Sequence, residues 1–247
     1  MNPRERERMR EIEGRHWYFV GKRELIVATV EKLLPRDRPL LLDVGCGTGS
    51  TVRALNVAAR PVGVDESAEA LLLGARRADA RLCVARGDRA LPFRDETFRL
   101  VTALDVLEHV EDDRLALRHM SRVCERGGHL LITVPAQHFL WSEHDDALGH
   151  KRRYGRQEII DRLRETGFDV LRTTYFNSLL FPAALLFRLG RRAIPGRGSA
   201  ESSDFFVELP RWVNALFLAA FRFERILLAR IDLPIGVSLL AIARRPS

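Results

Sequence analysis

The chain has 247 residues, of which 46% are hydrophobic and 30% are charged, a composition typical of globular proteins. Length and composition fit one large α/β domain better than two small ones. The formal net charge is +7. Residues 1–174 hold 30 basic and 28 acidic residues, whereas 175–247 hold 10 and 5. The near-neutral first part lacks the basic stripe that binding to a nucleic-acid backbone requires, which argues against a nucleic-acid partner.

The three cysteines, Cys46, Cys83 and Cys124, show neither paired nor metal-type spacing. The first residues, 1–15, are rich in Arg and Glu rather than apolar. Nothing in these features indicates export, so we predict a cytoplasmic protein. Peripheral contact with the inner face of the membrane is the alternative.

Apolar runs alternate with segments of helical periodicity along most of the chain, as in βαβ units with right-handed crossovers. The predicted helices are 16–34, 51–59, 67–77, 112–125 and 156–165, with Gly127-Gly128 and Gly167 ending the last two. The predicted strands are 40–44, 61–65, 81–84, 100–104, 129–134, 169–174 and 237–243. We therefore expect an α/β fold with a doubly wound, mostly parallel, seven-stranded sheet.

About sixty residues, 175–236, separate the last two predicted strands, where a compact domain would place a short connection. We predict a helical insertion in a domain formed by 1–174 and 237–247. Its apolar runs, Leu179–Phe187 and Ala215–Phe221, are too short to span a bilayer.

The segment Arg211–Ile231 is predicted to be an amphipathic helix. One stripe carries Arg211, Asn214, Arg222 and Arg225, and the apolar arc carries Trp212, Leu216, Phe217, Phe223 and Ile226. Three roles stay open for the insertion: a lid, a homodimer face or an interfacial membrane contact. A lid or dimer face is favoured.

A glycine-rich segment, Asp43–Gly49, lies between a predicted strand and a predicted helix. Its glycines allow a sharp turn and let a ligand lie against bare backbone. The spacing G-x-G-x-G differs from the dinucleotide pattern G-x-G-x-x-G, so the ligand need not carry a phosphate.

Two acidic residues end the next strands: Asp65 follows the second, and Asp88, after Gly87, follows the third. Carboxylates at successive carboxyl ends of parallel strands can accept hydrogen bonds from ribose hydroxyls and from an adenine amine. The alternative is that these aspartates only cap the following helices.

This order of motifs, with Asp105 and Leu107-Glu108-His109 before a Gly-Gly strand, resembles the class I S-adenosylmethionine-dependent methyltransferases over roughly residues 12–174 and the end strand. The resemblance implies S-adenosyl-L-methionine as cofactor and S-adenosyl-L-homocysteine as product. It places Gly45, Cys46 and Gly47 at the methionine part, Asp65 at the ribose, Asp88 and Arg89 at the adenine and Leu104 at the sulfonium, with Asp43 orienting the loop.

Two further segments, Glu13–Phe19 with Lys22-Arg23 and Asp145–Tyr154, are similar to a bacterial small-molecule methyltransferase subgroup with HW[WY]F and DxxGHxRRY-like motifs. Arg23 is expected to pair with the cofactor's carboxylate. His16 and Trp17 either cover the cofactor or simply pack in the core.

Methyl transfer requires mainly that the acceptor atom be held in line with the methyl carbon. His109 is the expected base for a hydroxyl acceptor, with His144 as a second catalytic candidate, although Glu108 and His109 could only begin a helix. A divalent metal on Asp105, Glu108 and His109, with His144 or His150, is an alternative that is not favoured.

The loop after the fifth strand should border the acceptor, with Trp141, Arg152 and Arg153 as substrate-binding candidates. A solvated charge run is the alternative for the arginines. The sequence thus predicts a methyltransferase that O-methylates a small-molecule, glycan-related or lipid-linked acceptor. Alternatives are a nucleic-acid methyltransferase and a cofactor-binding protein that does not methylate, such as a cyclase.

Overall fold

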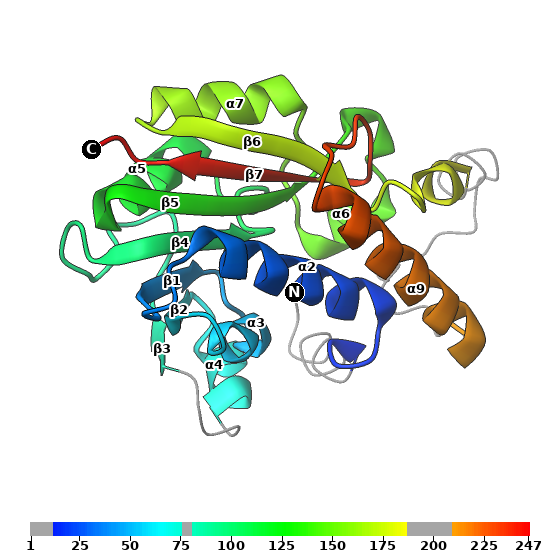
Figure 1. Cartoon of the computed structure of the whole chain (residues 1–247), viewed down its shortest axis with the longest axis horizontal. Coiled ribbons are helices and arrows are strands. Elements are labelled where there is room, and N and C mark those ends of the chain that lie inside the picture. Colours follow the sequence, from blue (N-terminus) through cyan, green and yellow to red (C-terminus); the bar gives the residue numbers. More distant parts are fainter. Residues whose placement is uncertain (1–11, 76–80, 187–208) are drawn as a thin grey trace.

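The computed structural model describes residues 12–75, 81–186 and 209–247, which contain a seven-stranded sheet (Figure 1). The strand order is β3-β2-β1-β4-β5-β7-β6, and β7 alone runs antiparallel to its neighbours. The strands are β1 (Leu40–Val44), β2 (Arg60–Asp65), β3 (Arg81–Val84), β4 (Phe98–Leu104), β5 (Cys124–Pro135), β6 (Asp169–Phe176) and β7 (Ser238–Arg244). The predicted doubly wound, mostly parallel sheet is confirmed.

Helices cover both faces of this sheet, because each strand side buries apolar residues. The helices are α2 (Trp17–Leu33), α3 (Ser50–Leu55), α4 (Ala68–Ala75), α5 (Asp113–Val123), α6 (Glu143–Leu148), α7 (Arg156–Glu165) and α9 (Arg211–Leu228), with a 3-10 turn η1 (His138–Leu140). In β1, Leu42 and Val44 pack towards α5 and α7, whereas Leu41 packs towards α2 and α9. Two-sided burial leaves the strand ends and their loops as the place for ligands.

Two predicted helix ends are wrong. The predicted helix over 51–59 ends at Leu55. The predicted helix over 112–125 ends at Val123, and β5 begins at once at Cys124, so the glycine pair lies inside the strand and not between helix and strand. Gly127 has φ +68°, and the pairing of β4 with β5 shifts register between Phe98 and Leu100. An irregular strand of this kind accommodates glycine in a conformation that other residues avoid.

The insertion contributes α9, which packs along α2 (Figure 1). A Cβ atom on Gly21 would lie 2.7 Å from Cγ of Phe221, so glycine is what lets the two helices approach. Asn214 Oδ1 accepts a hydrogen bond from the backbone N–H of Trp17 at 2.9 Å. The Trp17 ring meets Phe217 edge-on, with centroids 5.4 Å apart. Trp17 therefore packs against the insertion.

The start of the insertion is held by Glu224, which is buried on α9. Its Oε2 accepts hydrogen bonds from the backbone N–H groups of Ser178 and Leu179 at 2.7 and 2.8 Å. Among the described residues, no helix combines the length and the hydrophobicity needed to cross a bilayer.

Candidate functional site

A cavity of about 510 Å³ opens where the carboxyl ends of β1, β2, β3 and β4 meet. Its lining combines the glycine loop after β1, the acidic ends of β2 and β3, and the segment after β4. The lining residues are Glu13, Gly45, Cys46, Gly47, Thr48, Ser50, Thr51, Asp65, Glu66, Ser67, Ala70, Ala85, Arg86, Gly87, Asp88, Asp105, Val106, His109, Val110, Glu111, Leu148 and Lys151. A cavity at this edge of a doubly wound sheet is the usual place for a nucleotide-like ligand.

The glycine loop after β1 is shaped by residues with left-handed backbone. Gly45 and Gly47 have φ of +72° and +55°, and Gly49, at +71°, precedes α3. The N–H groups of Gly45 and Cys46 both donate to the carbonyl oxygen of Val64. These bonds fix the loop to β2, and the absence of side chains on the glycines leaves its backbone open to a ligand.

Asp65 joins this loop to the next strand end. Its Oδ2 accepts from the N–H of Gly47 at 2.8 Å, and its Oδ1 accepts from the N–H of Ser67 at 2.9 Å. The carboxylate therefore caps the turn before α4 and also lines the cavity. The capping interpretation and the ribose interpretation of Asp65 are compatible, because each oxygen has two acceptor positions.

Asp88 also lines the cavity, but its partner differs from the expected one. Arg86 donates to both Asp88 oxygens, at 2.9 and 2.7 Å, and this interaction lowers the pKa of the Asp88 carboxyl. Arg89 is exposed and lies outside the lining, whereas Arg86 belongs to it. The sequence offered a signal for this pair, because an arginine two residues before an aspartate can reach its carboxylate with both nitrogens.

Two further predicted cofactor residues, Asp43 and Leu104, do not line the cavity. Asp43 is buried, and its Oδ1 accepts from Thr102 Oγ1 at 2.7 Å. Burial raises the pKa of Asp43 to about 7. Asp43 is buried and comes two residues before Gly45, which fits its predicted role of orienting the glycine loop.

The segment before β1 closes one side of the cavity through Glu13, a residue that the sequence argument missed. Glu13 Oε2 accepts from Thr48 Oγ1 at 2.7 Å, and Oε1 is buried without a hydrogen-bond partner among the described residues. Arg23 donates to the carbonyl of Glu13 at 3.2 Å and to Ser50 Oγ at 3.0 Å. Arg23 thus lies behind two lining residues.

His16 caps the start of α2, where its Nδ1 accepts from the N–H of Tyr18 at 3.3 Å. Burial lowers the pKa of His16 to about 4. The imidazole lies outside the cavity lining, so the structure supports the packing alternative more than contact with the cofactor.

The opposite end of the cavity is formed by the segment after β4. Asp105, with φ +58°, accepts from Lys22 Nζ at 2.5 Å and from Thr133 Oγ1 at 2.8 Å. Burial opposes ionisation of Asp105, but the Lys22 ammonium outweighs it and lowers the pKa. His109 lines the cavity beside Asp105, and burial lowers the pKa of the His109 imidazole.

The loop after β5 is not brought to the cavity in the predicted way. Arg153 is buried and donates to both oxygens of Asp145, at 2.8 and 3.0 Å, and to the carbonyl of Ala136. Trp141 Nε1 donates to Asp146 Oδ1 at 3.1 Å. Neither Arg153 nor Trp141 lines the cavity. Their assignment to substrate binding gains no support from this arrangement.

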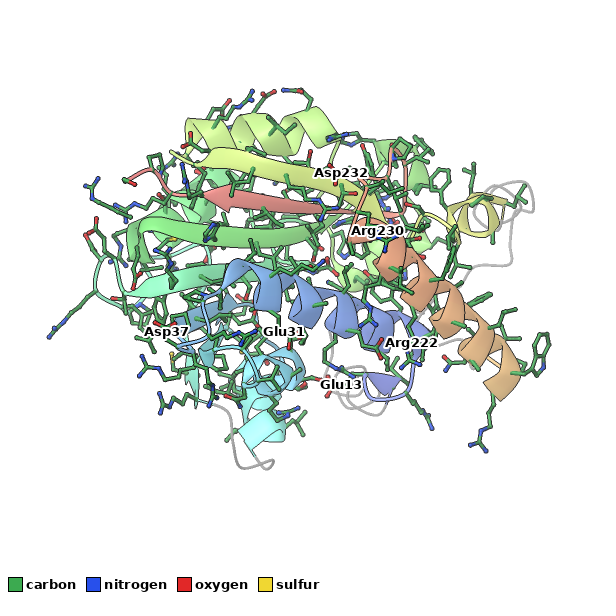
Figure 2. The ribbon with its side chains drawn as sticks, in the orientation of Figure 1. Glu13, Glu31, Asp37, Arg222, Arg230 and Asp232 are labelled. Carbon is green, nitrogen blue, oxygen red and sulfur yellow. The ribbon has the colours of Figure 1, made fainter. Side chains whose placement is uncertain are left out.

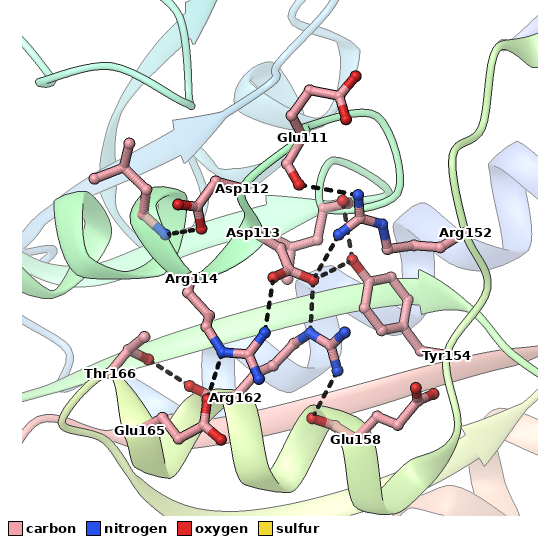
Figure 3. Close-up of polar contacts among 12 residues, drawn as sticks. Glu111, Asp112, Asp113, Arg114, Arg152, Tyr154, Glu158, Arg162, Glu165 and Thr166 are labelled. Atoms are coloured by element: carbon pink, nitrogen blue, oxygen red, sulfur yellow. Dashed lines mark hydrogen bonds and ion pairs between the residues drawn. The ribbon is translucent and has the colours of Figure 1, made fainter.

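Arg152 is occupied by a second buried carboxylate, shown in Figure 3. It donates to Asp113 at 3.3 Å and to the carbonyl of Glu111 at 2.9 Å. Asp113 also accepts from Arg162 at 2.6 Å and from the Tyr154 hydroxyl at 3.0 Å (Figure 3). This network ties α5 to α7 and gives Arg152 a structural role.

The second predicted catalytic histidine, His144, is buried and lies outside the cavity lining. Its ring lies 6.4 Å from that of His150, centroid to centroid. His150 instead approaches His109, with ring centroids 4.9 Å apart. The structure therefore brings His150, rather than His144, next to His109, which lines the cavity.

The comparisons with known proteins match the part of the chain that contains the glycine loop, Asp65 and Asp88. Residues 42–132 match the family model described as a methyltransferase domain. Malonyl-[acyl-carrier protein] O-methyltransferase of Halorhodospira halophila is 32% identical over 163 residues, which cover 60% of this chain and 55% of that protein. Probable tRNA methyltransferase 9B of Homo sapiens is 30% identical over 123 residues, 47% of this chain and 26% of that protein. The chain thus spans about half or less of the length of these relatives.

Among solved structures, a Haloferax volcanii chain in complex with a methyltransferase activator superposes with a TM-score of 0.64 at 18% identity. The match covers 98% of this chain and 95% of that one. Sheet order and superposition together define the Rossmann-like methyltransferase fold.

Proposed function

We propose that the chain is an S-adenosylmethionine-dependent methyltransferase that methylates an oxygen of a small-molecule, glycan-related or lipid-linked acceptor. The observation that carries the proposal is one cavity in which the Gly45–Gly47 backbone, Asp65 and Asp88 converge from three adjacent strand ends. The family match over residues 42–132 covers the same stretch.

Each part of the cofactor has a complementary group in this proposal. The ribose hydroxyls donate to Asp65, and the adenine lies beside Asp88, which Arg86 holds in place. The methionine part lies against the glycine loop, and its ammonium group donates to the unpartnered oxygen of Glu13. A hydrogen bond from this ammonium group would remove the free-energy cost of burying the Glu13 oxygen without a partner.

The acceptor occupies the end of the cavity lined by Asp105, His109 and Lys151. Transfer from a sulfonium is an in-line displacement, so the enzyme needs chiefly to hold the acceptor oxygen against the methyl carbon. Of the two histidines predicted to act in catalysis, His109 is the one that this proposal retains, because it lines the cavity.

A lipid-linked acceptor is the class that the outer face of α9 supports. Trp212 is 71% exposed, and Leu216, Phe223 and Ile226 are exposed on the same helix. The exposed Arg211 begins α9 and the exposed Arg230 lies just beyond its end, whereas Arg222 is paired with Glu24 of α2 (Figure 2). Apolar side chains flanked by arginines fit the surface of an anionic membrane. We propose that α9 rests on such a surface, with a homodimer face or a lid as the outcomes that would replace it.

Isothermal titration of the full chain with S-adenosyl-L-methionine tests the first half of the proposal. Asp65→Ala should weaken binding by about tenfold or more, because it removes a charged acceptor from the ribose. Asp161→Ala, at an exposed carboxylate on α7, is the control and should bind as the parent protein does. Unchanged affinity in Asp65→Ala, with a circular dichroism spectrum like the parent's, would contradict the placement.

A nucleic-acid acceptor is the second candidate, favoured by the similarity to a tRNA methyltransferase. Salt-sensitive retention of the protein on RNA would support it, and retention that salt does not change would count against it. Mass analysis of the acceptor addresses the third alternative, since a gain of one methyl group excludes a protein that only binds the cofactor.

A further inference from the structure

Glu108, His109 and His150 form a cluster beside the acceptor end of the cavity. One potential ligand atom from each residue lies within 4.8 Å of the other two. Donor atoms bound to one first-row cation lie about 2.0–2.2 Å from the ion and therefore up to about 4.4 Å apart. The 4.8 Å limit of the cluster exceeds this value by only about 0.4 Å.

The carboxylate of Glu108 gives independent evidence for a cation. Glu108 is fully buried, and neither of its oxygens receives a hydrogen bond from another residue that the structure describes. Buried carboxylate oxygens nearly always have a partner, because burying one without compensation is costly. Asp105 is nearby but is already paired with Lys22, so it adds negative charge and no donor.

His150 is oriented as a metal-binding imidazole would be. Its Nδ1 lies 2.9 Å from Asp145 Oδ1, and the Asp145 carboxylate is fixed by the buried Arg153. A carboxylate acceptor places the proton on Nδ1 and leaves the Nε2 lone pair for a ligand. Carboxylate–imidazole pairs of this kind commonly orient histidines that bind metals.

We infer that Glu108, His109 and His150 bind one divalent first-row transition cation at the acceptor end of the cavity. Two imidazoles with one carboxylate favour such an ion over Mg²⁺ or Ca²⁺, which prefer oxygen donors throughout. This set replaces the predicted triad, because Asp105 belongs to the Lys22 pair and His150 takes its place.

The role of the ion rests on the proposed function. His109 lines the cavity, so positions on the ion that the protein leaves open face the acceptor. A cation there would hold the acceptor oxygen and stabilise its deprotonated form, which makes it a better nucleophile for the methyl group. His109 then acts as a ligand, and water accepts the acceptor's proton.

Binding of the ion is measured without any acceptor. The full chain is treated with a chelator, desalted and titrated with Mn²⁺, followed by electron paramagnetic resonance, and then with Zn²⁺ by calorimetry. We expect one equivalent per chain. Glu108→Gln and His150→Gln should each weaken binding by about tenfold or more, as substitutions around metal sites do. His119→Gln on α5, outside the cluster, is the matched control and should bind like the parent.

If Glu108→Gln does not fold, His109→Gln still tests the site, because the His109 side chain is more exposed than that of Glu108. No binding of either ion by the parent chain, or full-strength binding in all three ligand variants, overturns the inference. A titration with S-adenosyl-L-methionine on the same samples separates the two proposals. Cofactor binding without ion binding overturns only the cation site, whereas ion binding without cofactor binding overturns only the proposed function.

Discussion

A Cβ atom added to Gly45 would lie 2.4 Å from Cγ2 of Val106, so the loop after β1 and the segment after β4 meet where only glycine fits. Gly45 also has φ +72°, a conformation that other residues rarely adopt. Both features shape the wall of the cavity. Substitutions in the glycine loop can therefore distinguish the effect of packing against Val106 from the effect of backbone strain.

We predict that Gly45→Ala lowers the free energy of unfolding by about 2–4 kcal/mol, through overpacking against Val106 and backbone strain together. Gly47→Ala is the matched control, since its φ is also positive but nothing lies within 4 Å of an added Cβ. It should cost only about 1–2 kcal/mol of strain. Urea denaturation of both variants measures the difference, and equal losses would show that the Val106 contact is not limiting.

The buried Asp43 predicts how the stability of the cofactor-free protein depends on pH. Burial raises the pKa of this carboxyl to about 7 from 3.8, so the folded state holds a proton that the unfolded state releases. The contribution of Asp43 to the free energy of unfolding is therefore greatest below about pH 4. It falls as the pH rises towards 7, by about 4 kcal/mol at most.

Asp43→Asn removes that ionisation, so its melting temperature should fall less than the parent's between pH 5 and 8. Each unit by which the pKa differs between the folded and unfolded states changes the free energy of unfolding by about 1.4 kcal/mol. Asp161→Asn, on the surface of α7, should follow the parent. Parallel curves for Asp43→Asn and the parent would mean that Asp43 does not titrate in this window.

The network around Asp113 predicts a structural role for Arg152 and Arg162. Asp113 is 2% exposed and is contacted by three arginines, Arg114, Arg152 and Arg162, and by the Tyr154 hydroxyl (Figure 3). Asp113→Ala would leave these groups without their shared acceptor and should destabilise the protein by about 3–5 kcal/mol.

The exposed pair of Arg126 with Glu96, which does not touch Asp113, is the control. Arg126→Ala should cost less than about 1 kcal/mol, because water screens an exposed ion pair. Denaturation measures both values. Asp113→Ala should keep the parent's affinity for S-adenosyl-L-methionine at a temperature where it is folded, and a selective loss of that affinity would contradict a purely structural network.

The membrane proposal for α9 predicts binding to vesicles that contain anionic lipid. The double variant Trp212→Ser with Phe223→Ser removes two exposed rings and should weaken the affinity for these vesicles by about tenfold or more, because the rings would bury apolar surface in the membrane interface. Val57→Ser, at another exposed apolar residue, is the control. Absence of vesicle binding by the parent chain, with a concentration-dependent dimer in ultracentrifugation, would replace the membrane by a second copy.

The strand positions followed from sequence because strands in the middle of the sheet, such as β1, are buried on both faces and therefore appear as short apolar runs. The predicted runs at 40–44 and 81–84 coincide with β1 and β3. The boundary before β5 was wrong because Gly127-Gly128 resembles a helix stop, whereas pairing with β4 extends the strand across it. Local propensity cannot report such pairing.

Part of the site could also be predicted from the sequence. The glycine loop, Asp65 and Asp88 follow strand ends in the sequence, and all of them line the cavity. Glu13 was missed because it lies 35 residues before its partner Thr48, and only the fold brings the two together. Arg153 was expected to face a substrate, but the buried Asp145 captures its guanidinium.

By itself, the sequence determined the alternation of strands and helices that forms a doubly wound sheet and the motif that forms one wall of the cavity, because both depend on short-range patterns of burial and backbone freedom. Only the tertiary structure decided which charged groups are free to meet a ligand. It paired Asp105 with Lys22 and brought His150 to Glu108 and His109. Those choices depend on which side chains are excluded from water together, and no local pattern encodes that.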